Sequence, residues 1–476
     1  ADVILVARSQ TKELNPPVPL KLDRAKVTFL PEQDLTKFNA AGKIEEGGRL
    51  RVKGQVINDT GKIDLNLEGF RLAATEIANL VVLPVELQAG TIDSKLDITL
   101  PKKQNPQLKG TAKLNKVTWQ IAELAKPFTR SNGKLHFDGY KIEIDRVSTR
   151  LGEVAAVANG MLDTEAEGNY QIEATTKPVE IDKIIEALEL EKPGIAIEGK
   201  VKSDLNITGS LPSPKINVAA VTTTPIRIDK VDFKSVNANL DLIDNYLWVR
   251  QFTGTPQVGG EITGTGRVQL DGRQNIFFDA RAKNVPGKQF VRNYNDNLPI
   301  DIGLVSGSAK FLARGGNLDT LQAVDGEAKF PLGGGTVIVD NFNYLPGGWQ
   351  SQLKTVNVDF ASLPIAKNSA ENIGKGKVNT TLEVTGDKSS FELGEIKAEG
   401  VASLNTIGGT VNVPNLSLER GTWVADANTS QLNLNRVFPE LPTEFNGLVT
   451  GTFDLTGNVE GETKIDGQGN LDLAEG

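Results

Sequence analysis

Pairs of carboxylates are the side chains of this sequence with the most direct capacity for acid–base chemistry. Glu45 and Glu46 are adjacent in the sequence, and Glu143 and Asp145 are two residues apart. Some glycosidases carry their catalytic acid and base as such pairs on strands. Alternate positions of a strand share one face, however, and carboxylates are expected on the wet face of any sheet. Because no cluster of several acids converges on one face, we predict no catalytic residue and no enzyme.

Three glycine-rich segments have the composition of phosphate-binding loops. They are residues 264–266, 333–335 and 374–377. None has the Gly-Lys-Ser/Thr ending that opens a helix in a P-loop. We interpret the first two segments as turns and the third as the lead-in to a strand.

Metal and nucleophile chemistry have few candidate residues. The chain has no cysteine, which excludes disulfides, thiolate metal sites and a cysteine nucleophile. Its single histidine, His136, lies in an alternating segment that predicts a surface position on a strand. We therefore expect no metal and no cofactor. The absence of cysteine is also typical of an exported, Gram-negative-type compartment.

The distribution of charged residues excludes the class of proteins that bind polyanions. The 52 basic and 60 acidic residues give a net charge of −8 and are interspersed, so we expect no nucleic-acid partner. The hydrophobic residues, 39% of the chain, are mostly Val, Ile and Leu, with only 18 Phe, 5 Tyr, 4 Trp and one Met. The 48 glycines are spread along the chain and divide it into short segments. This composition favours many strands and turns, and thus an all-β fold.

Period-two alternation places aliphatic side chains on one face of each expected strand and polar ones on the other. It is clearest at residues 62–68, 91–100, 141–145, 200–208, 337–341, 377–385 and 451–456. A helical spacing of Ile181, Ile184, Ile185 and Leu188 predicts a short amphipathic helix over 179–190. Weaker helical interruptions are expected near 76–83, 287–297, 359–367 and 435–440.

A repeat becomes visible when the segments after these interruptions are aligned. Three of them begin with Gly, continue for nine residues and end in Thr-Gly, from Gly199, Gly376 and Gly447. Looser copies begin at Gly90 and Gly307, so the starts are separated by 109, 108, 69 and 71 residues. We interpret residues 1–476 as one continuous β-repeat array, not as conventional domains.

Strands that are apolar on one face must cover that face with protein or with another apolar molecule. Scarce aromatic side chains favour a curved sheet around a narrow aliphatic groove, which lipid acyl chains would complete. The predicted groove lining is Ile63, Leu65, Leu67, Leu96, Ile98, Val201, Leu205, Ile207, Val378, Leu382, Val384, Phe453 and Leu455.

The short helix, the strand ending in Thr-Gly and the Pro-containing link at 209–216 together resemble the TamB family of the AsmA-like superfamily, with its chloroplast inner-envelope relatives. The resemblance implies an elongated β-taco, in which a curved sheet encloses a hydrophobic groove. It also implies an inner-membrane anchor, a place in the periplasm or intermembrane space, and an outer-membrane barrel of the BamA-like superfamily as partner. The implied roles are transfer of phospholipid or glycolipid between membranes and assistance in outer-membrane protein assembly or translocation.

The sequence leaves alternatives open. No run reaches the roughly 18 to 20 apolar residues of a membrane-spanning helix, and we expect this chain to be a piece of a longer protein with its anchor elsewhere. A rigid β scaffold for protein assembly or import at the barrel is one rival. A β-helix adhesin or passenger is another, which requires a coil period of roughly 20 to 25 residues.

Overall fold

The computed structural model describes the chain except for residues 1, 6–17, 45–46, 81–84, 102–106, 122–123, 164–168, 191, 193, 211–212, 272, 295–301, 316, 364–375, 388–390, 438–446, 460–464 and 475–476. The described part is all-β with a few short helices, which confirms the predicted class. It divides into two compact units. Unit 1 comprises Ala1–Lys192, Ile197–Thr224 and Ala238–Leu247, and unit 2 comprises Pro193–Ala196, Pro225–Asn237 and Trp248–Gly476.

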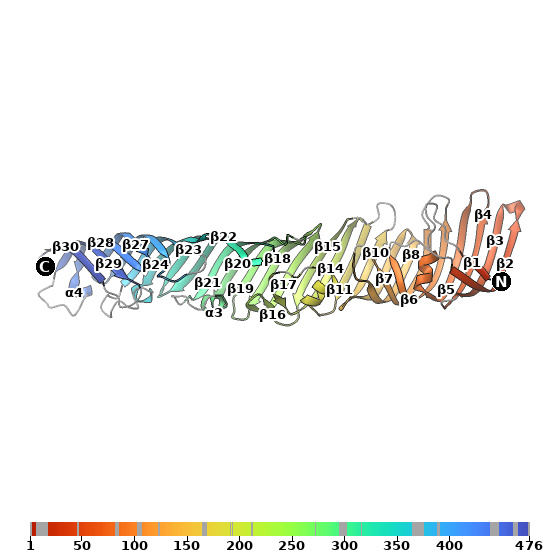
Figure 1. Ribbon diagram of the computed structural model, residues 1–476, viewed down its shortest axis with the longest axis horizontal. Helices are drawn as coiled ribbons and strands as arrows, with labels where there is room; N and C mark the ends of the chain where they lie inside the picture. The colour runs from red at the N-terminus through yellow and green to blue at the C-terminus, as the bar shows by residue number, and fades with distance from the viewer. Residues whose placement is uncertain are drawn as a thin grey trace. The chain divides into compact units, whose positions relative to one another are not determined.

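Unit 1 is an antiparallel meander in which each long strand pairs with the next one along the chain (Figure 1). After β11 the partner is β14, because β12 and a helix intervene. The strands are β1 (Asp2–Leu5), β2 (Val18–Leu30), β3 (Leu35–Ile44), β4 (Arg49–Ile57), β5 (Lys62–Ala73), β6 (Glu86–Leu100), β7 (Gln107–Gln120), β8 (Phe128–Gly139), β9 (Lys141–Leu151), β10 (Val154–Asp163), β11 (Asn169–Thr176), β12 (Val179–Glu180), β13 (Ile197–Glu198), β14 (Lys200–Ser210) and β15 (Ser213–Thr222). The helices are η1 (Pro31–Gln33), α1 (Ala74–Leu80) and α2 (Ile181–Ala187).

Unit 2 continues the same plan, with antiparallel pairing of each strand from β19 to β30 with its successor. Its strands are β16 (Ile226–Ile228), part of β17 (Val231–Ile243), most of β18 (Tyr246–Pro256), β19 (Glu261–Gln269), β20 (Ile276–Pro286), β21 (Leu304–Arg314), β22 (Asn317–Leu332), β23 (Gly335–Leu345), β24 (Gly348–Asp359), β25 (Gly376–Gly386), β26 (Lys397–Thr406), β27 (Gly409–Glu419), β28 (Thr422–Asn433), β29 (Leu448–Asn458) and β30 (Ile465–Ala474). The helices are α3 (Gly287–Val291), η2 (Phe360–Ser362) and α4 (Leu434–Val437). Among the described residues the sheet of each unit stays open, since its pairings do not join its first strand to its last.

Every alternating segment named above lies within a strand, as predicted. The predicted helix over 179–190 is shorter than expected. Val179 and Glu180 form β12 and pair with Val201 and Lys200, so α2 begins only at Ile181. The four weaker interruptions coincide with α1, α3, η2 and α4, and residues 81–83, 295–297, 364–367 and 438–440 lie outside the described residues.

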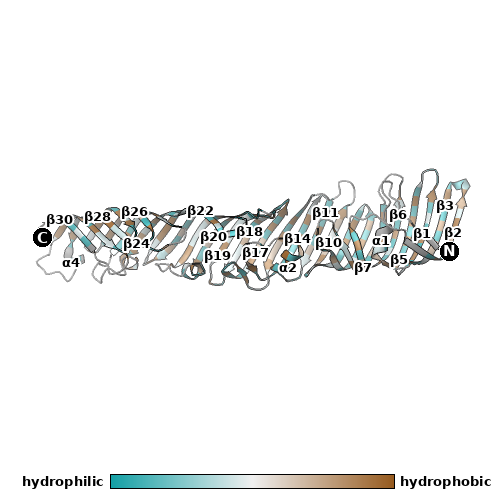
Figure 2. Cartoon of the chain, in the orientation of Figure 1, coloured by the Kyte–Doolittle hydropathy of each residue, from teal (hydrophilic) through white to brown (hydrophobic). Residues whose placement is uncertain are grey.

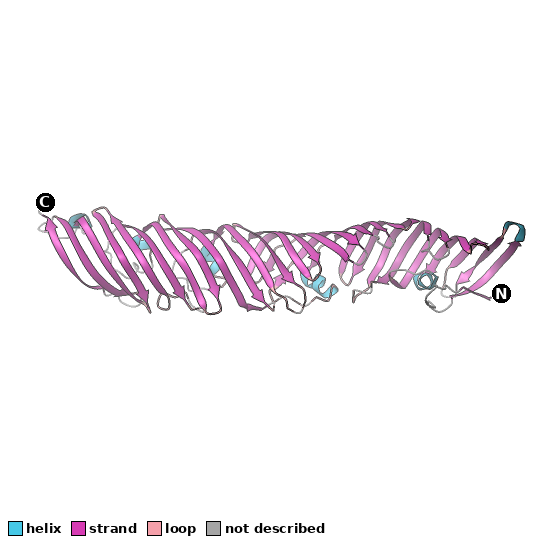
Figure 3. Cartoon of the chain, turned by 90° about the horizontal axis from the view of Figure 1, so that it is seen from above, coloured by secondary structure: helices cyan, strands magenta, loops and turns pink. Residues whose placement is uncertain are grey.

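Within unit 2 the helical segments lie along one edge of the sheet. Alternate strands of an antiparallel meander run in the same direction, and α3, η2 and α4 follow β20, β24 and β28. Figure 1 shows α3 and α4 on the same side of the row of strands, and in the view of Figure 3 most of the helices overlap the strands. We call this the helical edge, and we call the edge formed by the other strand ends the open edge. In unit 1, α1 and α2 follow β5 and β11 and define a helical edge by the same rule.

A β-bulge precedes the helical segment at four of these places. The bulged residue has a left-handed φ and lies three residues before the helix begins; these residues are Arg71, Asn284, Asn357 and Gln431. The aliphatic residue that follows the bulge is among the most buried of the chain, as with Leu72 at 1% and Val358 at 0% exposure. Bulges bend a strand and increase its twist, so they curve the sheet where the helix begins.

Two neighbouring strands accommodate each bulge. The strand after the helix supplies a polar acceptor, so that the Asn357 N–H donates to Asn379 Oδ1 at 2.9 Å and the Gln431 N–H to Thr450 Oγ1 at 3.2 Å. These acceptors lie three residues after Gly376 and Gly447, two of the repeat starts. On the other side a glycine lies against the bulge. A Cβ at Gly260, the residue before β19, would meet Val285 Cα at 2.6 Å.

One glycine-rich interpretation is wrong. Residues 264–266 are not a turn but lie inside β19, where the ring of Phe278 on β20 covers both glycines. A Cβ at Gly264 would approach that ring to 2.6 Å, so the glycines make room for an aromatic side chain. Gly333 and Gly334 form the turn between β22 and β23, and Gly376 opens β25.

Candidate functional site

The predicted lining residues of unit 1 share one face of its sheet, which we call the inner face. Leu65 on β5 lies opposite Ile98 on β6, and Leu67 lies opposite Leu96, so their side chains project to the same side. Figure 2 shows the resulting alternation of apolar and polar bands along the strands. Farther along the same face, Leu205 and Ile207 of β14 lie opposite Ala174 and Ile172 of β11.

In unit 2 the register also joins predicted residues that are far apart in sequence. A single row crosses five strands, from Leu382 on β25 through β26, β27 and β28 to Leu455 on β29. The members of this row are Leu382, Gly400, Leu416, Ala425 and Leu455. Because directly opposite residues share a face, this row defines the inner face of unit 2.

The predicted lining residues are not equally accessible. Ile98, Val201, Val378 and Val384 are buried, with 5–8% of their surface exposed. The other nine are half-buried: Ile63, Leu65, Leu67, Leu96, Leu205, Ile207, Leu382, Phe453 and Leu455. Val201 and Val378 lie close to the helical edge, whereas Leu205 and Leu382 lie farther along the same strands.

The helical edge is closed by packed side chains. In unit 1, Ala74 and Ile77 of α1 join a cluster with Ile92, Leu114 and Val117. In unit 2, Leu363 after η2 packs on the cluster that contains Phe330 and Val358. The helical segments therefore cover one end of the inner face. Toward the open edge, Leu205 and Leu382 are half-buried, while Ile98 and Val384 are buried there by the sheet itself.

In unit 2, the hydroxyl groups of Thr355 and Thr429 near the helical edge are satisfied by the sheet itself. Thr355 donates to the Val378 carbonyl at 3.3 Å and lies 3.1 Å from the Thr380 hydroxyl. Thr429 donates to the Thr410 carbonyl at 2.9 Å. Because these bonds are internal, they present little polarity to an apolar ligand on the inner face.

Two tryptophans that the sequence reasoning missed lie at the open edge of unit 2. Trp349 is the second residue of β24 and lies opposite Gly386, and Trp423 is the second residue of β28 and lies opposite Gly457. A Cβ at either glycine would come within 2.6 Å of the indole. These glycines end two of the Thr-Gly motifs, and the 74-residue separation of the tryptophans was the signal that could have identified them.

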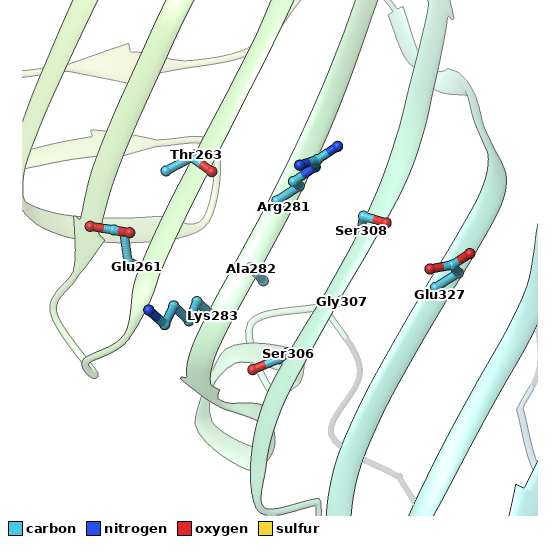
Figure 4. Close-up of a pocket in the computed structure, with 9 residues that line it drawn as sticks. All are labelled: Glu261, Thr263, Arg281, Ala282, Lys283, Ser306, Gly307, Ser308 and Glu327. Atoms are coloured by element: carbon cyan, nitrogen blue, oxygen red, sulfur yellow. The ribbon is translucent and has the colours of Figure 1, made fainter.

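The outer face carries the polar chemistry. A shallow hollow of about 560 Å³ lies over β19 to β22 and is lined on that face by Arg281, Lys283, Glu261 and Glu327, among others (Figure 4). Opposite charges are mixed in it, so it has no strong preference for one sign of ligand. Nearby, the Lys310 ammonium bonds to Asp325 at 2.7 Å, which raises the pKa of Lys310.

The candidate acid–base residues also lie on the outer face or outside the described residues. His136 is partly exposed, with Nε2 3.9 Å from Asp145 Oδ2. Asp145 also pairs with Arg146 at 3.4 Å, while Glu143 lies opposite His136. Glu45 and Glu46 lie outside the described residues. Within the described residues, no three His, Cys, Asp or Glu side chains gather in a way that could hold a metal ion.

The architecture is thus an open antiparallel sheet in each unit with an aliphatic inner face and a charged outer face. None of the helices in the described part of the chain is long and apolar enough to cross a membrane. No family model, curated protein or solved structure matches the chain.

Proposed function

We propose that the inner faces of the two units bind lipid acyl chains and that the chain is part of a non-enzymatic lipid bridge between two membranes. The observation that supports this most directly is the half-buried aliphatic surface between the closed helical edge and the open edge. Among the described residues, each extensive strand–strand contact is between neighbours in the meander.

Acyl chains are the ligand class that fits such a surface. The half-buried Leu205, Leu382 and Phe453 offer dispersion contacts and no hydrogen-bonding group. Complete burial of one such side chain contributes about 1.5–3 kcal/mol, and many lie along each face. Because no polar side chain is needed to recognise a headgroup, we propose that phospholipids and glycolipids are accepted alike.

The resemblance to the TamB family is part of this proposal. The repeated unit of helical segment, Gly-to-Thr-Gly strand and following strands supports a β-taco, in which the sheet curves around its apolar face. With the resemblance come the proposed inner-membrane anchor, the periplasmic or intermembrane location and the BamA-like barrel as partner. These rest on the sequence resemblance alone.

The test is to measure bound lipid on matched variants. We expect the chain purified from cells to release phospholipid on extraction and to show lipid adducts in native mass spectrometry. Leu205→Asp and Leu382→Asp place a charge on the half-buried part of the inner face and should abolish this binding. Val221→Asp and Val401→Asp are the controls, because these valines are exposed on the outer face, at 43% and 49%.

A folded Leu205→Asp/Leu382→Asp double variant that retains lipid, as judged by unchanged circular dichroism and extraction, would reject the proposal. So would a lipid-free wild-type chain. Loss of lipid from all four variants would indicate a general effect of surface charge, not lipid binding along the inner face.

A rigid scaffold for protein assembly is the second candidate. It is favoured by the regular, hydrogen-bonded bulges, which fix the curvature of each unit. It predicts that the inner-face variants retain assembly or import function after losing lipid. The β-helix adhesin has less support, because a β-helix stacks parallel coils and every pairing described here is antiparallel.

A further inference from the structure

We infer that Trp349 and Trp423 are positioning residues at the open edge of unit 2, where they hold the polar end of a diacyl lipid while its chain ends point toward the helical edge. The inference rests on the proposed lipid binding and adds an orientation to it. It depends on the contrast between the two edges of one inner face.

The two tryptophans occupy equivalent places. Each is the first inner-face residue of the strand that leads into a helical segment, β24 before η2 and β28 before α4. Each indole lies over a glycine of the next strand, so the ring lies flat on the sheet at its edge. Trp349 is further fixed by stacking on Phe391, with ring centroids 4.9 Å apart.

At the helical edge, the inner-face side chains of the same strands are shielded from water. On β24, Thr355 is 5% exposed and Val358 is fully buried. On β28 the buried stretch begins beside the tryptophan, with Ala425 at 5%, and extends to Thr429 at 3%. The six residue steps from Trp349 to Thr355 span roughly 20 Å of extended strand. One leaflet of a bilayer has a hydrocarbon layer roughly 15 Å thick, so acyl chains could lie along the strand between these two ends.

Charged residues lie beside Trp423 at the open edge. Glu419 ends β27 and Arg420 follows it in the turn before β28, whereas the helical-edge turn between β26 and β27 contains only Ile407 and Gly408. Charge is not confined to the open edge, because Lys377 pairs with Asp359 at 2.8 Å at the helical edge. Headgroups require water or charge beside them. Tryptophan collects at boundaries between hydrocarbon and water because its ring is apolar and its N–H is polar.

Depth-dependent quenching of tryptophan fluorescence tests the inference on the full chain. The probes are two phosphatidylcholines, one brominated near the ester carbonyls and one near the terminal methyl groups. The signal of each indole is the difference between wild type and the Trp349→Phe or Trp423→Phe variant. We expect the bromine near the carbonyls to quench this signal roughly twofold more than the bromine near the chain ends.

Trp248→Phe is the matched control, because the Trp248 ring packs against Arg250 and Arg267 and not on the inner face of β24 to β29. It should leave the difference between the two probes unchanged. Equal quenching by both probes, or stronger quenching by the chain-end bromine, would overturn the orientation. Bound lipid without quenching of either indole would remove the tryptophans from the site but keep lipid binding, whereas no bound lipid would reject the proposed function itself.

Discussion

The two ends of the strands in unit 2 carry the same alternating pattern but differ in what covers them. On β24, Val358 at the helical edge is fully buried, while Leu353 and Trp349 toward the open edge remain half-buried. The difference arises because the bulge, the glycine opposite it and the returning helical segment converge on one end only. An aliphatic stripe therefore combines a structural core and an accessible surface within one strand.

Introducing a charge at each end should give the largest contrast. We expect Val358→Asp to lower the free energy of unfolding by about 4 kcal/mol or more, because an unpaired carboxylate would be buried. Leu382→Asp should cost only about 1–2 kcal/mol, since its side chain is half-exposed already. Urea unfolding followed by circular dichroism measures both. Similar losses would mean that the open end is as closed as the helical end.

A glycine at the bulge should be more sensitive than a glycine in a free turn. Gly260 and Gly139 have similar φ values, +77° and +70°, but only at Gly260 would a Cβ meet neighbouring backbone. Both alanine variants bear the cost of a left-handed φ, about 1–2 kcal/mol. We expect Gly260→Ala to lose roughly 2 kcal/mol beyond that, from displacement of Val285. Equal melting temperatures for the two variants would contradict the close packing at the bulge.

Removing a bulge acceptor should have a smaller effect. Asn379→Ala leaves the Asn357 N–H without its side-chain acceptor and should cost about 1–2 kcal/mol. Asn458→Ala is the control, because Asn458 only accepts an exposed bond from Thr422 at the open edge. Its loss should stay within about 0.5 kcal/mol. Urea unfolding of the two variants shows whether the side-chain acceptors at the bulges stabilise the helical edge more than an exposed hydrogen bond stabilises the open edge.

The smallest effect concerns pH. Burial raises the pKa of Tyr294, which follows α3, and its bond to the Asp229 carboxylate raises it further. A raised pKa means that this contact stabilises the fold fully below the ordinary tyrosine pKa near 10 and is lost as pH rises through the folded value. Because burial also raises the pKa of Tyr344, ultraviolet titration should show late ionisation of both tyrosines, and the Tyr294 component should disappear in Tyr294→Phe. In Asp229→Asn the late ionisation should move partway back, and an unchanged titration in both variants would exclude the contact.

The sequence by itself determined the local structure of this protein. Strict alternation at 62–68, 141–145 and 377–385 specifies strands because side chains on a strand alternate between faces whatever surrounds them. Loss of the period-two alternation located the helical interruptions, since a helix and a strand require different periods. The Gly-to-Thr-Gly segments then became visible after these interruptions. Alternation also places the predicted lining residues of each single strand on one face of that strand.

Only the tertiary structure decided which of those residues are covered. Val378 and Leu382 lie on one face of one strand, yet the first is buried and the second half-buried, because cover comes from residues of other strands and helices. The glycines of 264–266 show the same limit. Their role depends on Phe278 of the neighbouring strand, and a cross-strand neighbour is set by register, which no local pattern encodes.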